Sequence, residues 1–172
     1  WAKENKKPDG TSYNIYTDGL KIYTTLDTRM QKHAEEATVE HLRNHQKIID
    51  AQFRSGWNPW KKELGQKILL SACKNTPRWR NMKAEGMSDD AILEVFKTQK
   101  NKMTVFSYNG MKDTTFTPYD SVRYYKSFLQ VGFMVMEPNT GYVKAWVGGP
   151  NFNYFKVDHC NPQRQVGSTF KP

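Results

Sequence analysis

A complete β-hairpin is encoded by the stretch Val131-Gly132-Phe133-Met134-Val135-Met136-Glu137-Pro138-Asn139-Thr140-Gly141-Tyr142-Val143-Lys144-Ala145-Trp146-Val147. Two runs of apolar, β-branched and aromatic residues flank a turn over residues 137–141. Both runs are nearly continuous in apolar residues, so we expect central strands that are covered on both faces. Gly148-Gly149-Pro150 ends the second strand, and a loop is expected over residues 151–165.

The segments upstream of the hairpin predict helices and one more strand. Thr117 is expected to cap a helix with Pro118 in its first turn. Residues 19–27 alternate apolar and polar side chains, which is typical of a half-buried strand. Asp27 or Thr28 then caps a helix that runs to about residue 50. The apolar stripe of that helix is Met30, Ala34, Ala37, Val39 and Leu42.

Residues 51–112 differ in sequence pattern from the segments on either side. We expect them to form an inserted basic subdomain of small helices. The predicted features are a Trp57-Asn58-Pro59-Trp60 turn, helices near 67–73 and after Ser88-Asp89-Asp90, a break at 76–80, a strand at 103–108 and a turn at Asn109-Gly110. Residues 1–18 are polar and turn-rich and are predicted to be a linker. The remaining parts are residues 19–50, a strand and a helix, and residues 113–172, which hold the second helix, the hairpin and the C-terminal motif.

The net charge of the 172-residue chain is +9, and most of the surplus lies between residues 61 and 112. A basic surface can meet nucleic acid, an anionic membrane or an acidic polymer, but a solvated face is the favoured interpretation. The run Arg78-Trp79-Arg80 could stack on bases, yet no nucleic-acid motif accompanies it, so no nucleic acid is expected. No apolar run approaches the roughly 20 residues that span a bilayer, and no signal-peptide pattern opens the chain. Because it begins with Trp1 and not methionine, the chain is expected to be an excised fragment.

Metal ligands and disulfides are weakly indicated. His41 and His45 are spaced four apart on a predicted helix with His33 earlier, but the H-E-x-x-H pattern is absent. His159-Cys160 has no second ligand pair nearby. Cys73 and Cys160 have no zinc spacing, and they are expected to be free, with a disulfide as the alternative. No metal and no cofactor is therefore expected.

The C-terminal residues Val166-Gly167-Ser168-Thr169-Phe170-Lys171-Pro172 carry the chemistry. If a helix begins there, Ser168 and Lys171 lie on one face, one turn apart. Serine is a weak nucleophile until a neighbouring base takes its proton, and the lysine amine is placed to do so. The helix N-terminus adds positive potential beside the hydroxyl. Ser168 and Lys171 are the predicted catalytic residues.

Five blocks of sequence resemble class A penicillin-binding proteins. The segment 164–172 is similar to that family's R-Q-P-G-S-[ST]-F-K-P stretch, with Val166 in place of proline. Residues 18–27 resemble the entry into the transpeptidase region, and Met30-Gln31 with Ala34-Glu35 resembles the L-Q-x-x-A-E-x-A helix. Residues 137–149 resemble the D-P-x-T-G-x-[VI]-x-A-x-V-G-G hairpin, and Phe152-Asn153 resembles the F-N element after it.

This resemblance implies the N-terminal part of a β-lactamase-like transpeptidase domain, of α/β (α+β) class, with an antiparallel sheet and flanking helices. The implied activity is that of a peptidoglycan D,D-transpeptidase that forms a serine acyl-enzyme and is acylated by β-lactams. The implied partners are stem peptides and glycan strands, with cell-wall synthesis proteins on residues 51–112. The parent would be anchored in the cytoplasmic membrane with this part on the extracytoplasmic side. The family's S-x-N and K-[ST]-G motifs do not follow Lys171, so the chain alone is expected to be inactive.

Two other functions fit the same sequence. One is a β-lactam sensor or serine hydrolase that shares S-x-x-K without polymer synthesis. The other is a non-catalytic basic module that docks a partner through residues 51–112. Trp57 and Trp60 could also stack on sugar rings, although such tryptophans are more often packing anchors.

Overall fold

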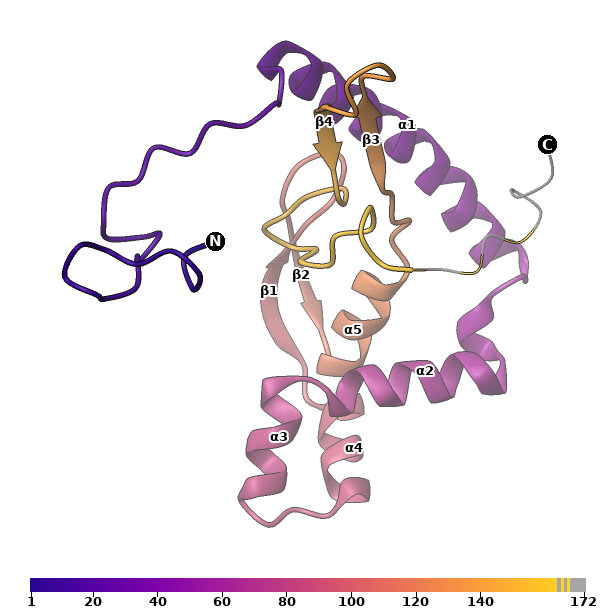
Figure 1. The fold of residues 1–172 in the computed structure, drawn as a ribbon. Coiled ribbons are helices and arrows are strands. Elements are labelled where there is room, and N and C mark those ends of the chain that lie inside the picture. Colours follow the sequence, from indigo (N-terminus) through magenta and orange to yellow (C-terminus); the bar gives the residue numbers. More distant parts are fainter. Residues whose placement is uncertain (164, 166, 168–172) are drawn as a thin grey trace.

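A computed structural model describes residues 1–163, 165 and 167 (Figure 1). Its order is α1 (Thr28–Ser55), the 3-10 turn η1 (Pro59–Lys61), α2 (Glu63–Lys74), α3 (Pro77–Ala84), α4 (Asp89–Thr98), β1 (Asn101–Val105), β2 (Lys112–Phe116), α5 (Pro118–Lys126), β3 (Phe133–Met136) and β4 (Val143–Val147). Helices and two small antiparallel sheets are mixed, which confirms the predicted fold class. None of the helices within the described residues has the length and apolar character needed to cross a bilayer.

The β3–β4 hairpin packs on α1 through one face. Phe133 pairs with Val147 and Met134 with Trp146, and a register irregularity follows Val135. Ala34 of α1, which is 6% exposed, meets Ala145, which is fully buried. Small residues at this contact let the helix approach the sheet closely, which explains why the helix carries alanine where a larger side chain would hold it off.

A second, aromatic core joins α1 to the lower half of the molecule in Figure 1. Leu42, Phe106 and Tyr108 are buried there; α5 adds Tyr125, and the segment after it adds Phe128 and Leu129. The Phe106 ring lies 5.4 Å from the Tyr108 ring, edge to face, which is a preferred geometry for aromatic pairs. This core therefore holds the hairpin half and the helical half together.

The third core lies between the helices of the region 63–126. Phe96 and Ile92 of α4 are almost wholly buried against Cys73 and Trp79. Three of these helices, α3, α4 and α5, begin at a side-chain cap: Thr76 accepts a hydrogen bond from Trp79 N, Ser88 from Ala91 N, and Thr117 from Asp120 N. Two of these helices also carry proline in the first turn, so the local sequence fixes where they begin.

The caps of α1, α4 and α5 confirm predictions from sequence, since Asp27, Ser88 and Thr117 all accept helix N–H groups. The hairpin is confirmed as well. The long helix ends at Ser55 rather than near residue 50, and Gly56 with φ +120° follows it. The stripe that it buries is Ala34, Thr38, Leu42 and Gln46, whereas Met30 is 48% exposed.

One prediction of local structure was wrong, and two others were incomplete. Residues 19–27 form no strand, because they meet β4 only through Thr25 Oγ1 to Val143 O at 2.7 Å and Asp27 N to Lys144 O at 2.9 Å. The strand expected at 103–108 spans 101–105 and pairs with β2, which was not predicted. The break expected at 76–80 does end the preceding helix, since α2 stops at Lys74, but Thr76 and Pro77 also begin α3, which was not predicted.

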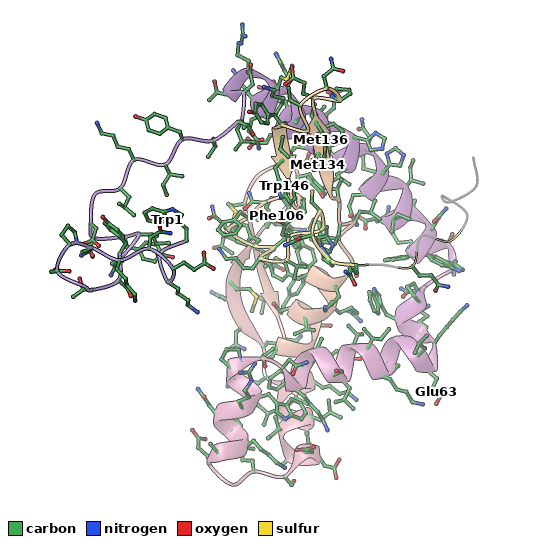
Figure 2. The ribbon with its side chains drawn as sticks, viewed as in Figure 1. Trp1, Glu63, Phe106, Met134, Met136 and Trp146 are labelled. Carbon is green, nitrogen blue, oxygen red and sulfur yellow. The ribbon has the colours of Figure 1, made fainter. Side chains whose placement is uncertain are left out.

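The expectation of strands covered on both faces is also wrong. Met134 and Met136 are 42% and 47% exposed, and Figure 2 shows both on the hairpin with Trp146. Alternate residues of a strand point to opposite faces, so α1 covers Val135 and leaves its neighbours open. Among the described residues no second layer packs on that side.

Candidate functional site

Ser168 and Lys171 lie outside the described residues. The nearest segment that the structure describes continuously is the loop that leads toward them. That loop follows β4 and is described from Gly148 to Gln163. It runs back across the end of the hairpin and beside α1. Its attachments decide where the chain leaves the fold on its way to the predicted nucleophile.

The first attachment is aromatic. Phe155 packs edge to face on Phe106 with 5.6 Å between ring centroids, and it lies 5.5 Å from Phe128. A tight turn places it there, because the N–H groups of Tyr154 and Phe155 both donate to the carbonyl of Asn151. The loop thereby shares the core that joins α1 to α5.

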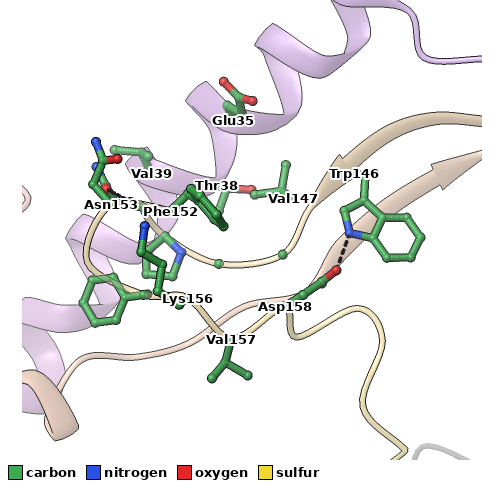
Figure 3. A pocket seen from close by; sticks show the side chains of 15 residues that line it. Glu35, Thr38, Val39, Trp146, Val147, Phe152, Asn153, Lys156, Val157 and Asp158 are labelled. Atoms are coloured by element: carbon green, nitrogen blue, oxygen red, sulfur yellow. Dashed lines mark hydrogen bonds between the residues drawn. The ribbon is translucent and has the colours of Figure 1, made fainter. Parts of the chain in front are cut away.

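The second attachment is the segment Asp158-His159-Cys160, which we call the latch. Asp158 Oδ2 accepts a hydrogen bond from the indole Nε1 of Trp146 at 3.0 Å, and its Oδ1 accepts from the backbone N–H of Cys160 at 2.9 Å (Figure 3). The N–H of His159 donates to the carbonyl of Gly148 at 2.7 Å. The Cys160 thiol lies 3.3 Å from the carbonyl oxygen of Val147 and 3.5 Å from that of Phe133. The latch therefore contacts both strands at the end of the hairpin.

Two glycines make room for the latch. A Cβ on Gly132 would come within 2.5 Å of the carbonyl oxygen of His159, and one on Gly148 would come within 2.5 Å of Asp158 Oδ1. Distances this short are not tolerated between non-bonded atoms. At Gly132 the obstructing atoms are backbone, so only glycine permits this close approach, whereas a side chain at Gly148 would force the Asp158 carboxylate to shift.

A pocket of about 570 Å³ lies between the loop and α1. Figure 3 shows Glu35, Thr38 and Val39 on the helix side, and Phe152, Asn153 and Lys156 on the loop side. The Lys156 ammonium sits 4.1 Å from the centre of the Phe152 ring. Because this space is open, the loop gains little packing from α1, and the latch and Phe155 hold it instead.

Gln31 joins α1 to β4 through hydrogen bonds to the backbone of Trp146. Its side-chain oxygen accepts from Trp146 N at 2.8 Å, and its Nε2 donates to Trp146 O at 3.0 Å. The same Nε2 lies 2.7 Å from Glu35 Oε1. These contacts give a physical reason for the Gln31, Ala34 and Glu35 pattern of the helix, since glutamine satisfies an exposed strand edge while alanine permits the close approach.

The turn of the hairpin is also locally built. Thr140 Oγ1 donates to the Glu137 carboxylate at 2.6 Å, and Gly141 adopts φ +72°. The Thr140 hydrogen bond, followed by the charge of Lys144, lowers the pKa of Glu137. Glycine is the residue suited to that backbone conformation.

The other candidate sites have structural explanations. His41 and His45 stack with 4.0 Å between ring centroids on the exposed side of α1, and within the described residues no group of three or more His, Cys, Asp or Glu could hold a metal. Cys73 and Cys160 are both free, so the disulfide alternative is wrong. Burial raises the pKa of the Cys73 thiol to about 11.

The basic region is partly neutralised by its own contacts. Lys74 and Lys83 each lie 2.7 Å from the carboxylate of Asp89. Trp79 is only 3% exposed, so the interpretation in which it stacks on bases is wrong. Trp60 donates its indole N–H to Ser127 Oγ at 2.8 Å, as expected of a packing anchor, while Trp57 stays 56% exposed beside Phe53.

Comparison with known proteins shows what the chain is similar to. Residues 54–129 match the model of the penicillin-binding protein middle domain. The chain is also 28% identical over 191 positions to penicillin-binding protein 1A of Rickettsia bellii, which covers 94% of this chain and 23% of that relative. Both findings show that the chain is similar to penicillin-binding proteins.

Two further 1A penicillin-binding proteins show the same pattern. Those of Vibrio cholerae and Aquifex aeolicus are each 25% identical over 91% of this chain, which corresponds to 24% and 22% of their own lengths. The chain thus spans less than a quarter of each of these penicillin-binding proteins. No solved structure matches it significantly.

The middle-domain match extends from the end of α1 through α5. It thus includes most of the segment that we expected to be an inserted subdomain at 51–112, and it continues past that boundary. Sequence reasoning missed the latch. The available signals were the adjacent glycines 148 and 149 and the need of the Trp146 indole for an acceptor.

Proposed function

We propose that the intact protein is a serine D,D-transpeptidase that cross-links peptidoglycan stem peptides. The observation that carries this is the pair Ser168 and Lys171 within the R-Q-V-G-S-T-F-K-P segment of a class A penicillin-binding protein. The described loop supports it, because the chain reaches that segment from a latch fixed on the sheet. The proposal also places this part of the protein outside the cytoplasm, in a membrane-anchored parent.

The proposed reaction has two transfers. Ser168 Oγ attacks the carbonyl carbon of the penultimate D-Ala while Lys171 Nζ takes its proton. The C–N bond to the terminal D-Ala breaks, and that amine leaves with the proton. An amine of a neighbouring stem then attacks the acyl ester, a new amide forms, and the serine regains its proton. A β-lactam would acylate the same oxygen by opening its ring, so its leaving nitrogen would stay attached to the acyl group.

The test uses fluorescent penicillin on the full-length protein. Wild type should be labelled covalently at Ser168, and Ser168→Ala should lose the label, while Ser71→Ala on the exposed side of α2 should keep it. Lys171→Arg keeps the positive charge but cannot accept the proton, so acylation should fall by orders of magnitude. Labelling that persists in Ser168→Ala would refute the assignment.

A second assay separates cross-linking from hydrolysis or sensing. Stem peptides supplied with an acceptor amine should yield the cross-linked product from wild type and none from Ser168→Ala. Acylation without any cross-linked product would favour a sensor or hydrolase. A Ser168 that no β-lactam modifies would favour a docking role for residues 51–112.

A further inference from the structure

We infer that the pocket between α1 and the loop after β4 binds a small zwitterion, namely a short peptide with a free ammonium and a free carboxylate. The pocket measures about 570 Å³, and small-molecule sites typically measure about 300–1,000 Å³. All the residues that line it are described. Binding there is independent of the serine chemistry proposed above.

Two opposite charges line this pocket without neutralising each other. Glu35 lies on the α1 wall and Lys156 on the loop wall (Figure 3). Neither side chain forms an ion pair with the other or with any further residue that the structure describes. A ligand with one charge of each sign can pair with both, whereas a neutral ligand would displace water from both charges and compensate neither.

Hydrogen bonds already orient the negative charge. Gln31 Nε2 donates to Glu35 Oε1 at 2.7 Å, and Gln31 is itself held by the N–H and the carbonyl of Trp146. Within the described part of the chain, Glu35 makes no second side-chain hydrogen bond, so its other oxygen can accept from a ligand ammonium. Because the carboxylate is held in place beforehand, little side-chain entropy is lost on binding.

An aromatic ring holds the positive charge on the opposite wall. The Lys156 ammonium lies 4.1 Å from the centre of the Phe152 ring, which is a cation–π contact. The ring covers only one side of the ammonium, and an ammonium has three N–H donors. Donors therefore remain for the carboxylate of a ligand.

Unpaired polar groups on both walls favour a peptide. Thr38 lies one turn after Glu35 on the same face of α1. Although Thr38 is only 8% exposed, its hydroxyl makes no hydrogen bond to a described residue, and buried hydroxyls normally have a partner. The side-chain amide of Asn153, on the loop wall, is also unpaired within the described residues. A peptide group offers both a donor and an acceptor to such groups.

The experiment measures the Kd of L-alanine, L-dialanine and L-trialanine for the full-length protein by NMR titration. Three lengths are used because the separation of the two charges decides which ligand reaches both. At least one of them should bind. Acetylating its amine or amidating its carboxylate should each raise Kd by about two- to fivefold, as expected for exposed ion pairs. Binding of the unmodified peptide should also weaken as salt is added.

Variants test which protein charge meets which ligand charge. Glu35→Gln should weaken the unmodified peptide but not the acetylated one, and Lys156→Gln should weaken the unmodified peptide but not the amidated one, because the partner charge is already absent. Glu36→Gln is the matched control, since it removes the same charge from the next residue of α1, which does not line the pocket. Thr38→Val keeps the side-chain shape without the hydroxyl, and it should weaken all forms of the peptide alike.

The outcomes separate this site from the proposed acyl site. Peptide binding that persists in Ser168→Ala, whether or not wild type is labelled by penicillin, supports the pocket. Loss of binding in Ser168→Ala would place the peptide at the acyl site and overturn the inference. Absence of binding by all three ligands, or equal losses in Glu35→Gln and Glu36→Gln, would overturn it too. Binding of neutral N-acetylglucosamine in place of the peptides would assign the pocket to a carbohydrate instead.

Discussion

Replacing Tyr108 with phenylalanine should stabilise the protein. Tyr108 is 9% exposed, and its hydroxyl is shielded from solvent with no hydrogen-bond partner among the described residues. Burial of a polar group without a partner costs about 1–3 kcal/mol, and phenylalanine removes that cost. The ring contacts with Phe106 and Phe128 are kept. The carbonyl of Tyr108 still accepts the hydrogen bond from Arg43 Nε.

The size of the effect follows from two opposing terms. Removing the unpaired hydroxyl gains about 1–3 kcal/mol, while the void left by one oxygen costs a few tenths of a kcal/mol at about 24 cal/mol per Å³. The free energy of unfolding should therefore rise by about 1–2 kcal/mol. For a domain of this size that corresponds to a rise of about 2–8 °C in Tm. Denaturant titration should show a higher midpoint with an unchanged m value.

Tyr124→Phe is the matched control, because it removes a hydroxyl from the same aromatic core with the opposite consequence. Tyr124 donates its hydroxyl to the carbonyl of Phe106 at 2.7 Å, so its loss should destabilise by about 1 kcal/mol or more. The reasoning is refuted if Tyr108→Phe lowers the free energy of unfolding by more than about 0.5 kcal/mol, or if both variants move it in the same direction.

The pH dependence provides a second check on Tyr108. Burial raises its pKa to about 12, whereas an unfolded tyrosine has a pKa near 10. The unfolded state therefore loses the proton first, and wild type loses stability as pH rises from 10 through 12. Phenylalanine has no proton to lose, so the advantage of the variant should widen over this range. A constant difference between the two proteins would contradict the assigned burial.

Two predictions concern the helices of the middle domain. Hydrogen bonds from Lys74 and then Lys83 lower the pKa of Asp89 to about 2. The stability that this carboxylate contributes is therefore present above pH 4 and is lost as pH falls toward 2. The Tm of Asp89→Asn should be lower than that of wild type at pH 7, and the two Tm values should converge near pH 2. Phe96 is 1% exposed in the core of α2–α4, so Phe96→Ala should cost about 3–5 kcal/mol in denaturant unfolding, and a loss under 1 kcal/mol would contradict that packing.

Local signals in the sequence were sufficient for several elements. The alternation of apolar runs around Glu137–Gly141 predicted the hairpin, since Gly141 and Thr140 favour the turn through their own backbone and side-chain contacts. Asp27, Ser88 and Thr117 predicted helix starts, because each caps N–H groups two or three residues away. The S-x-x-K segment and its neighbouring motifs indicated a resemblance to penicillin-binding proteins, which the comparisons bear out.

Contacts between distant residues decided the rest. Residues 19–27 have the pattern of a strand but do not form one. The Gln31 side chain hydrogen-bonds both the N–H and the carbonyl of Trp146, so these backbone groups of β4 are not available to pair with another strand. The apolar run of β3 predicted burial on both faces, but whether Met134 and Met136 are covered depends on which layers reach them.

The sequence by itself determined the elements whose capping and turn-forming residues lie within a few positions of one another, and it placed the candidate nucleophile by motif. Only the tertiary structure decided the latch, because Asp158 acquires its role from Trp146, twelve residues away, and from the missing side chain of Gly148. Hydrogen bonds and steric room of this kind depend on the distance between segments in space, and no local pattern of residues encodes that distance.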